Sequence, residues 1–259
     1  MSLASGLVNR LGYRLSRATK GGPLARFLSD MAPKPIATPL IRIGGDGDGG
    51  YLVPDCIDGI LACFSPGVAQ TCGFELDLAG RGIRSHMADL SVEGPPVVHP
   101  LFGFEKKFLG TVDDDQFTRL QSWVARHEPA GGDLLLQMDI EGAEYAVLLD
   151  TPPDVLRRFR IVVLELHAFD QVFVASAFDF YRQAMGKLLA DFDVVHVHPN
   201  NCSRLRSNGV FEVPRVLEVT FLRRDHVVAD PGRALTFPHP LDRPNIAGRA
   251  DLVLPRCMR

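Results

Sequence analysis

The stretch DLLLQMDIEGAEYAVLLD, residues 133–150, carries the pattern that decides the fold of this chain. The apolar run Leu134–Leu136 is typical of a buried strand, and the run ends abruptly at an acid, Asp139. Two more acids, Glu141 and Glu144, follow before the chain becomes apolar again. Acids in the first turn of a helix are stabilised by the helix dipole by roughly 0.3–1 kcal/mol each. The stretch therefore predicts a strand, a turn and the start of a helix.

Other short apolar runs alternate with helical patterns on both sides of this stretch. Such alternation requires crossover connections, and therefore predicts an α/β fold with a Rossmann-like, doubly wound, mostly parallel sheet. Proline and glycine mark the connections, and the glycine-rich residues 42–55 predict a loop or a tight hairpin. The predicted strands are 59–65, 84–91, 96–104, 160–167, 191–198 and 215–224. The predicted helices are 73–82, 114–127, 143–158 and 172–190.

Composition and cysteine usage indicate a globular protein in a reducing compartment. The chain has 259 residues, of which 46% are hydrophobic and 23% charged, so it can form one large domain with an added arm. No apolar run approaches the roughly 18 residues that span a bilayer, so we expect no transmembrane segment. The five cysteines show no CxxC spacing, which favours free thiols and a cytoplasmic location.

Charge is distributed unevenly along the chain. Residues 1–40 hold six basic residues and one acid, whereas residues 41–259 hold 22 basic residues and 30 acids. Together with the prolines near residue 35, this predicts a basic N-terminal helical arm and linker (1–40) before a single α/β domain (41–259). The acidic domain lacks a basic stripe, so we expect no nucleic-acid partner.

The basic arm has two interpretations that the sequence leaves open. It could make a weak contact with an anionic membrane surface. Alternatively, leucines at helical spacing could pack the arm on the body or on a second copy in a homo-oligomer; these are Leu3, Leu7, Leu11 and Leu15.

Four of the apolar runs end in a side chain that can ionise or bind a metal. These residues are Asp89, Asp139, His167 and His198. In a doubly wound sheet the ligand lies beyond the carboxyl ends of the strands. We therefore expect these four residues to share one mouth.

The period of a strand places Glu165 on the same face as His167. Buried carboxylates are costly unless they are paired, hydrogen-bonded or bound to a metal. Asp139, Glu165, His167 and His198 therefore predict either a charged hydrogen-bond network or a site for Mg²⁺ or Mn²⁺.

The glycine pattern argues against a dinucleotide cofactor but is compatible with a nucleoside cofactor that has no pyrophosphate. The chain has no GxxxxGK[ST] and no strict GxGxxG, and only Gly67 and Gly73 follow the first predicted strand of the alternating series. Asp89 lies about 22 residues past Gly67, where such folds place a carboxylate that accepts the ribose hydroxyls.

Two segments together resemble a known family. MDIEGAEYAVL (138–148), followed by VVLELH (162–167), resembles the signature of the FkbM-type S-adenosylmethionine-dependent methyltransferases, in which a strand ending in K-x-D-[IV]-E-G-x-E precedes one ending in E-x-H. Gln137 stands where lysine is common in that signature. DGDGGYLVPD (46–55) and CFSPGVAQTCGFELDLAGRG (63–82) are similar to the DGGY loop and first strand–loop–helix of one branch of the family.

The resemblance, which covers roughly residues 44–225, implies a cofactor and a set of residues that bind it. In S-adenosyl-L-methionine, the methionine part would lie against the loop Ser65–Gly67, with Asp48 covering its amino-acid end. Asp89 would bind the ribose, and Asp139 would lie near the sulfonium and the methyl acceptor. The adenine would lie beside Phe102 and Gly103.

The expected activity is O-methylation of a hydroxyl on a sugar or glycosylated metabolite, so the partner is a small-molecule or glycan acceptor. A sugar hydroxyl needs a base within about 3 Å, and His167 or His198 could serve. A divalent ion at Asp139 could instead lower the pKa of the hydroxyl. The alternatives are a non-catalytic relative that binds a nucleoside or sugar or acts as a scaffold, and a metal-dependent hydrolase.

Overall fold

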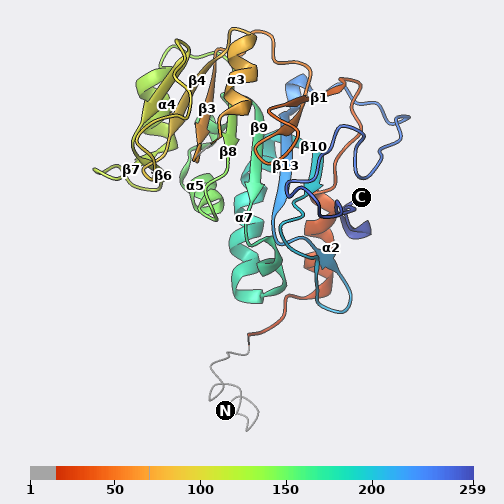
Figure 1. The fold of residues 1–259 in the computed structure, drawn as a ribbon. Helices are drawn as coiled ribbons and strands as arrows, with labels where there is room; N and C mark the ends of the chain where they lie inside the picture. The colour runs from red at the N-terminus through yellow and green to blue at the C-terminus, as the bar shows by residue number, and fades with distance from the viewer. Residues whose placement is uncertain (1–15, 70) are drawn as a thin grey trace.

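A seven-stranded, mostly parallel sheet forms the centre of the molecule (Figure 1). The computed structural model describes residues 16–69 and 71–259. One strand, β13, runs antiparallel to both of its neighbours, β10 and β9, whereas the remaining neighbours pair in parallel. In spatial order the strands are β10 (Phe192–Pro199), β13 (Leu217–Arg223), β9 (Phe159–Leu166), β8 (Leu134–Met138), β3 (Ala62–Pro66), β4 (Arg84–Ala88) and β5 (Phe102–Glu105). The α/β, doubly wound fold class is confirmed.

Three small strand pairs and several helices complete the described chain. The pairs are β1 (Leu40–Ile43) with β2 (Tyr51–Pro54), β6 (Phe108–Gly110) with β7 (Phe117–Arg119), and β11 (Arg206–Ser207) with β12 (Glu212–Val213). The α-helices are α2 (Gly21–Asp30), α3 (Gly73–Gly80), α4 (Leu120–His127), α5 (Glu144–Asp150), α6 (Pro153–Leu156) and α7 (Ala175–Asp191). The 3₁₀ helices are η1 (Phe169–Phe173), η2 (Arg224–His226) and η3 (Arg256–Met258).

Both faces of the sheet are buried, because alternate strand residues enter two separate cores. On one face, Leu134 and Leu136 of β8 pack with apolar residues of α2, α4, α5 and α7. On the other face, Leu135 packs with α3 and with the β1–β2 hairpin. The glycine-rich residues 42–55 form most of this hairpin, as the sequence predicts, although β1 already begins at Leu40.

The basic arm is described from residue 16 onward, and α2 packs on the body. Leu24, Phe27 and Leu28 are buried in the larger core, and the Phe27 ring contacts Phe178 of α7 at a centroid distance of 5.6 Å. The leucines expected to pack the arm lie outside the described residues. The domain boundary at residue 40 stays a prediction.

Three predicted elements differ most from the structure in their limits. The strand predicted at 96–104 begins only at Phe102, because prolines at 95, 96 and 100 cannot donate ladder hydrogen bonds. The helix predicted at 114–127 begins at Leu120, after the short strand β7. The helix predicted at 143–158 is divided into α5 and α6, because Pro152 and Pro153 interrupt the helical hydrogen bonds.

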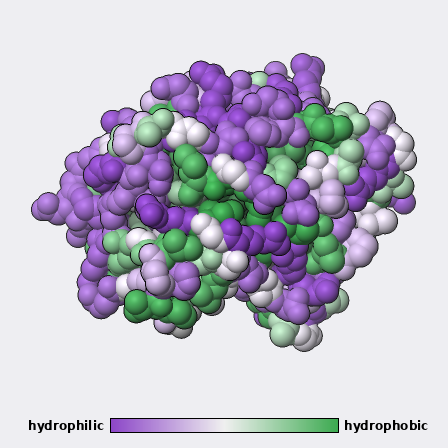
Figure 2. Space-filling view, turned by 90° about the horizontal axis from the view of Figure 1, so that it is seen from above, coloured by the Kyte–Doolittle hydropathy of each residue, from purple (hydrophilic) through white to green (hydrophobic). Residues whose placement is uncertain are grey.

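Figure 2 shows the molecule from above, as a mainly hydrophilic surface with apolar groups gathered near its centre and along one margin. Within residues 16–69 and 71–259, no helix is long and apolar enough to cross a membrane.

Candidate active site

The parallel strands bring the predicted residues to one edge of the sheet. Asp89, Asp139 and His167 each come directly after a parallel strand, and His198 lies near the end of β10. Because β13 is antiparallel, it contributes Glu218 near its start to the same edge. All four residues therefore lie at one edge of the sheet, but side-chain contacts join only Asp139 and His167 among them.

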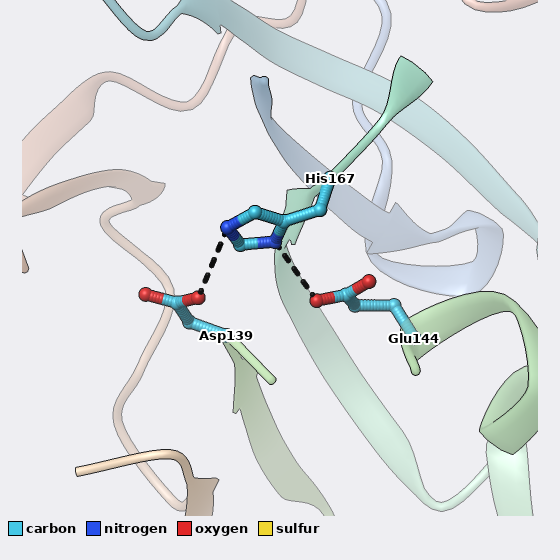
Figure 3. Close-up of side chains that lie close together, drawn as sticks. All are labelled: Asp139, Glu144 and His167. Atoms are coloured by element: carbon cyan, nitrogen blue, oxygen red, sulfur yellow. Dashed lines mark hydrogen bonds and ion pairs between the residues drawn. The ribbon is translucent and has the colours of Figure 1, made fainter. Parts of the chain in front are cut away.

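His167 lies between two carboxyl groups (Figure 3). Its Nδ1 is 3.1 Å from Oε1 of Glu144, and its Nε2 is 3.9 Å from Oδ1 of Asp139. Glu141 and Glu165 also approach Nε2, at 3.4 and 3.9 Å. Since Glu144 engages Nδ1, the imidazole has a fixed orientation and presents Nε2 to Asp139.

The turn between β8 and α5 holds Glu144 in this position. Glu141 and Gly142 both have positive φ, 57° and 109°, so the chain reverses sharply there. Oε1 of Glu144 accepts hydrogen bonds from the backbone N–H groups of Ile140 and Gly142, both at 3.1 Å. The Glu144 side chain is fully buried, whereas that of Glu141 is 88% exposed. The two acids of the EGxE motif therefore differ in role: Glu144 supports His167, and Glu141 faces solvent.

Burial and mutual charge shift the pKa values of this group. Burial, reinforced by Glu141 and Glu144 and opposed by His167, raises the pKa of Asp139 to about 7. Burial lowers the pKa of His167, but the hydrogen bond to Glu144 and the charges of Glu144, Asp139 and Glu165 outweigh it and raise the pKa to about 9. At neutral pH His167 is therefore an imidazolium, and Asp139 is the group that titrates near pH 7.

Glu165 belongs to a neighbouring hydrogen-bond network under the hairpin. The Tyr51 hydroxyl donates to its Oε2 at 3.2 Å, and Asn200 Nδ2 donates to its Oε1 at 2.9 Å. Burial and the nearby charges of Asp139 and Glu218 raise the pKa of Glu165 to about 9. Glu165 is therefore protonated at neutral pH and has a proton to donate.

His198 is not brought to the Asp139–His167 group. Its Nδ1 lies 3.1 Å from Glu218, and its Nε2 lies 3.0 Å from Asp251 of the C-terminal tail. Burial lowers the pKa of His198, but the hydrogen bond and charge of Glu218, with Asp242 and Asp251, raise it to about 9. With both ring nitrogens engaged by carboxylates, His198 has no free nitrogen for a substrate or a metal ion.

The C-terminal tail reaches this edge through further contacts. Asp242 lies 2.9 Å from His196, and Asn201 donates to the Ile246 carbonyl at 3.2 Å. Asn245 Nδ2 lies 3.4 Å from Oδ1 of Asp48, which is exposed on the β1–β2 loop. Asp48 thus contacts the C-terminal tail, and its role at the amino-acid end of the cofactor stays a prediction.

The loop after β3 approaches Asp139 closely. Gly67 has φ +86°, and a Cβ there would lie 1.7 Å from the Asp139 carbonyl oxygen. The Ser65 hydroxyl donates to Gln137 Oε1 at 2.6 Å and contacts the buried Glu75 carboxyl. Only glycine at position 67 lets this loop pack against the end of β8.

The residues predicted to bind the nucleoside lie farther along the same edge. Asp89 accepts hydrogen bonds from the Ala69 N–H at 3.0 Å and from the Ser91 N–H at 2.7 Å. Phe102 packs, partly buried, with Val68, Cys72 and Met87. A Cβ on Gly103 would lie 3.2 Å from His86 Nδ1, so this glycine packs against a histidine.

A cavity of about 30 Å³ lies between the hairpin, the loop after β3 and Asp139. Its lining includes Gly49, Tyr51, Gly67 and Gln137. Small-molecule sites usually enclose roughly 300 Å³ or more. The residues suit a nucleoside cofactor, with glycines for close approach and the Asp89 carboxyl at the end of β4, but the enclosed space is smaller than such a cofactor.

Comparison with known proteins bears directly on this site. Residues 78–194 match the family model of the methyltransferase FkbM domain. The FkbM region runs from α3 into β10, and therefore contains Asp89, Asp139, Glu144 and His167. The resemblance seen in the sequence is thereby confirmed over this region, and the sheet order is consistent with a class I methyltransferase-like fold. The family implies the use of S-adenosylmethionine.

A solved structure described as the medium-resolution structure of the bifunctional kinase-methyltransferase WbdD is similar at 16% identity and a TM-score of 0.34. The match covers 70% of this chain and 38% of that one. No curated protein matches this chain.

Glu144 was not among the residues predicted for the site. In the sequence it reads as an acid at a helix start, stabilised by the helix dipole. One feature of the sequence could have indicated its role. Glu144 comes two residues after Gly142, and the turn at this glycine brings the Glu144 carboxyl group back to His167.

Proposed function

We propose that this protein transfers a methyl group from S-adenosyl-L-methionine to a hydroxyl of a sugar or glycosylated metabolite. The observation that carries the proposal is the Glu144–His167–Asp139 arrangement inside the FkbM region. It places a carboxyl group with a pKa of about 7 at the carboxyl edge of the sheet. An ideal general base has a pKa near the working pH, and Asp139 meets this condition.

When bound, the cofactor supplies an electrophilic methyl group on a positively charged sulfur. The acceptor oxygen attacks this methyl group in line with the carbon–sulfur bond, and the sulfur leaves. Asp139 accepts the proton of the acceptor hydroxyl as the new O–C bond forms. His167, protonated and held by Glu144, stabilises the ionised form of Asp139 before the transfer. The sequence led us to expect a histidine as the base, whereas the proposal assigns Asp139 as the proton acceptor and His167 as its partner.

The acids that remain open to solvent beside His167 favour an acceptor rich in hydroxyls. The Asp139 side chain is partly exposed and that of Glu141 is 88% exposed. A sugar can donate hydrogen bonds to such carboxylates, whereas an apolar acceptor that covered them would leave them unsatisfied at a cost of roughly 1–3 kcal/mol each.

A divalent ion is a second way to activate the hydroxyl. One donor atom each from Asp139, Glu144 and His167 lies within 4.8 Å of the others, and this mixture of carboxylate and imidazole ligands suits Mn²⁺ or Mg²⁺. If His167 lost its proton and bound the ion through Nε2 beside Asp139, Glu144 would orient the ring through Nδ1 instead of binding the ion. The ion would lower the pKa of the acceptor hydroxyl, which would remove the need for Asp139 as a base.

The test is methyl transfer from methyl-labelled S-adenosylmethionine to a panel of nucleotide sugars and glycosides, with and without a chelator. Mass spectrometry should find the label on an oxygen atom, and Asp139→Asn should lose most of the activity. Asp154→Asn, an exposed acid on α6, is the matched control and should keep it. Cofactor binding without transfer to any acceptor would instead support a non-catalytic relative. Loss of activity on chelation, restored by Mn²⁺, would support the metal route.

A further inference from the structure

A groove of about 980 Å³ runs between α2 and α7. Basic side chains dominate its lining: Arg17, Lys20, Arg26, Lys34, Arg182 and Arg224. The acids that line it are Asp30 and Asp179. The apolar residues that line it include Phe27, Phe178 and Leu189. Neither the FkbM residues at the mouth nor the proposed reaction accounts for this concentration of positive charge.

Half of these cations already have carboxylate partners. Lys34 and Arg224 share Asp193, at 2.7 and 3.0 Å, and Arg182 lies 3.2 Å from Asp179. Within the part of the chain that the structure describes, Arg17, Lys20 and Arg26 have no carboxylate within 4.0 Å and are exposed. These three are available to a partner.

The packing of α2 fixes the positions of the available cations. Leu24, Phe27 and Leu28 bury one side of the helix in the core, so Arg26 must face outward. Arg17 and Lys20 precede α2, where Thr19 anchors the chain by donating to the Val172 carbonyl at 2.7 Å. A cationic surface held in place in this way binds without first having to order a flexible segment.

We propose that this groove docks the protein on an anionic phospholipid surface. Guanidinium and ammonium groups bind phosphates, and the groove presents exposed cations that have no carboxylate partner among the described residues. The acidic remainder of the chain, residues 41–259, would be repelled by the same surface, so docking would have a defined orientation.

The experiment is co-sedimentation of the full chain with vesicles of phosphatidylcholine alone and with vesicles that also contain phosphatidylglycerol. We expect binding to the anionic vesicles only, and weaker binding as salt shortens the range of the charges. Each basic residue near an anionic surface contributes about 1 kcal/mol, or about fivefold in affinity. Lys20→Gln/Arg26→Gln should therefore weaken binding roughly 30-fold. Circular dichroism confirms that each variant is folded.

Arg81→Gln/Arg84→Gln is the matched control, because it removes the same charge from two exposed residues, Arg81 directly after α3 and Arg84 at the start of β4. It should bind like the wild type. Equal losses in both double variants would overturn the proposal, since net charge alone would then explain binding. Two results with the wild type would also overturn the proposal: equal binding to neutral and anionic vesicles, and no binding to either. The absence of binding to any vesicle would favour an acidic protein as the partner of the groove. Because no cofactor is used, the outcome is independent of the proposed methyl transfer.

Discussion

Replacing Asp139 by Asn should stabilise the protein, and the gain should grow with pH. The pKa of Asp139 is about 7 in the folded chain, because burial penalises its charge. An unfolded aspartate has a pKa of about 3.9, so the difference corresponds to roughly 4 kcal/mol. The native state holds the proton more tightly than the unfolded state. The free energy of unfolding of the wild type therefore falls as pH rises from about 4 to about 7, and the loss is complete above pH 7.

Asparagine does not titrate, so the variant escapes this loss. It also removes one of the carboxyl groups that raise the pKa of His167, which offsets part of the gain. We expect the variant to match the wild type near pH 4 and to exceed it by about 1–4 kcal/mol at pH 8. The same variant should lose methyl transfer, so stability and activity would move in opposite directions.

The assay is urea denaturation followed by circular dichroism at several pH values between 4 and 8.5, with Asp154→Asn as the control. A stability difference that does not change with pH would refute the reasoning. So would an Asp139→Asn protein that is less stable than the wild type at pH 8, because the carboxylate would then be stabilised by His167 more than it is penalised by burial.

Three further substitutions test other parts of the site. Gly67→Ala should lower stability by at least about 1–2 kcal/mol and abolish cofactor binding. The reason is that Gly67 has a φ of +86° and that a Cβ there would meet the Asp139 backbone. An unchanged affinity for the cofactor in calorimetry would contradict this prediction. His198→Gln should cost about 3–5 kcal/mol at pH 6, since it leaves Glu218 buried without its cation. The pKa of His198 is raised to about 9, so the His198–Glu218 pair should stop stabilising the wild type as pH rises from about 6.5 through 9. Thermal unfolding should show this decrease in stability in the wild type but not in the variant. Glu144→Gln should lower the pKa of the His167 imidazole by roughly one or more, measured by NMR titration, and an unchanged value would show that Glu144 does not hold the ring.

The strand endings could be predicted from the sequence because two simple periodicities determine them. An apolar run that ends in an acid places Asp139 at the carboxyl edge of a parallel sheet, and the two-residue period of a strand pairs Glu165 with His167. Both features depend only on local sequence, and both are present in the structure.

Contacts between distant segments could not be predicted in this way. The histidine at the end of β10 looks equivalent to His167 in the sequence, but its partners, Glu218 and Asp251, come 20 and 53 residues later. Glu144 looked like an ordinary helix-start acid, because spacing does not reveal that a turn with two positive φ angles folds it under His167. The site thus depends on backbone geometry and tail contacts that neither residue type nor spacing specifies.

The most direct test of the central claim is calorimetric titration of the metal-stripped protein with S-adenosylhomocysteine. The account predicts micromolar binding, and a ligand concentration 100-fold above the dissociation constant should then add about 2.7 kcal/mol of stability. No binding, with or without added Mg²⁺ or Mn²⁺, would contradict the assignment of this edge of the sheet as the site of a methyltransferase.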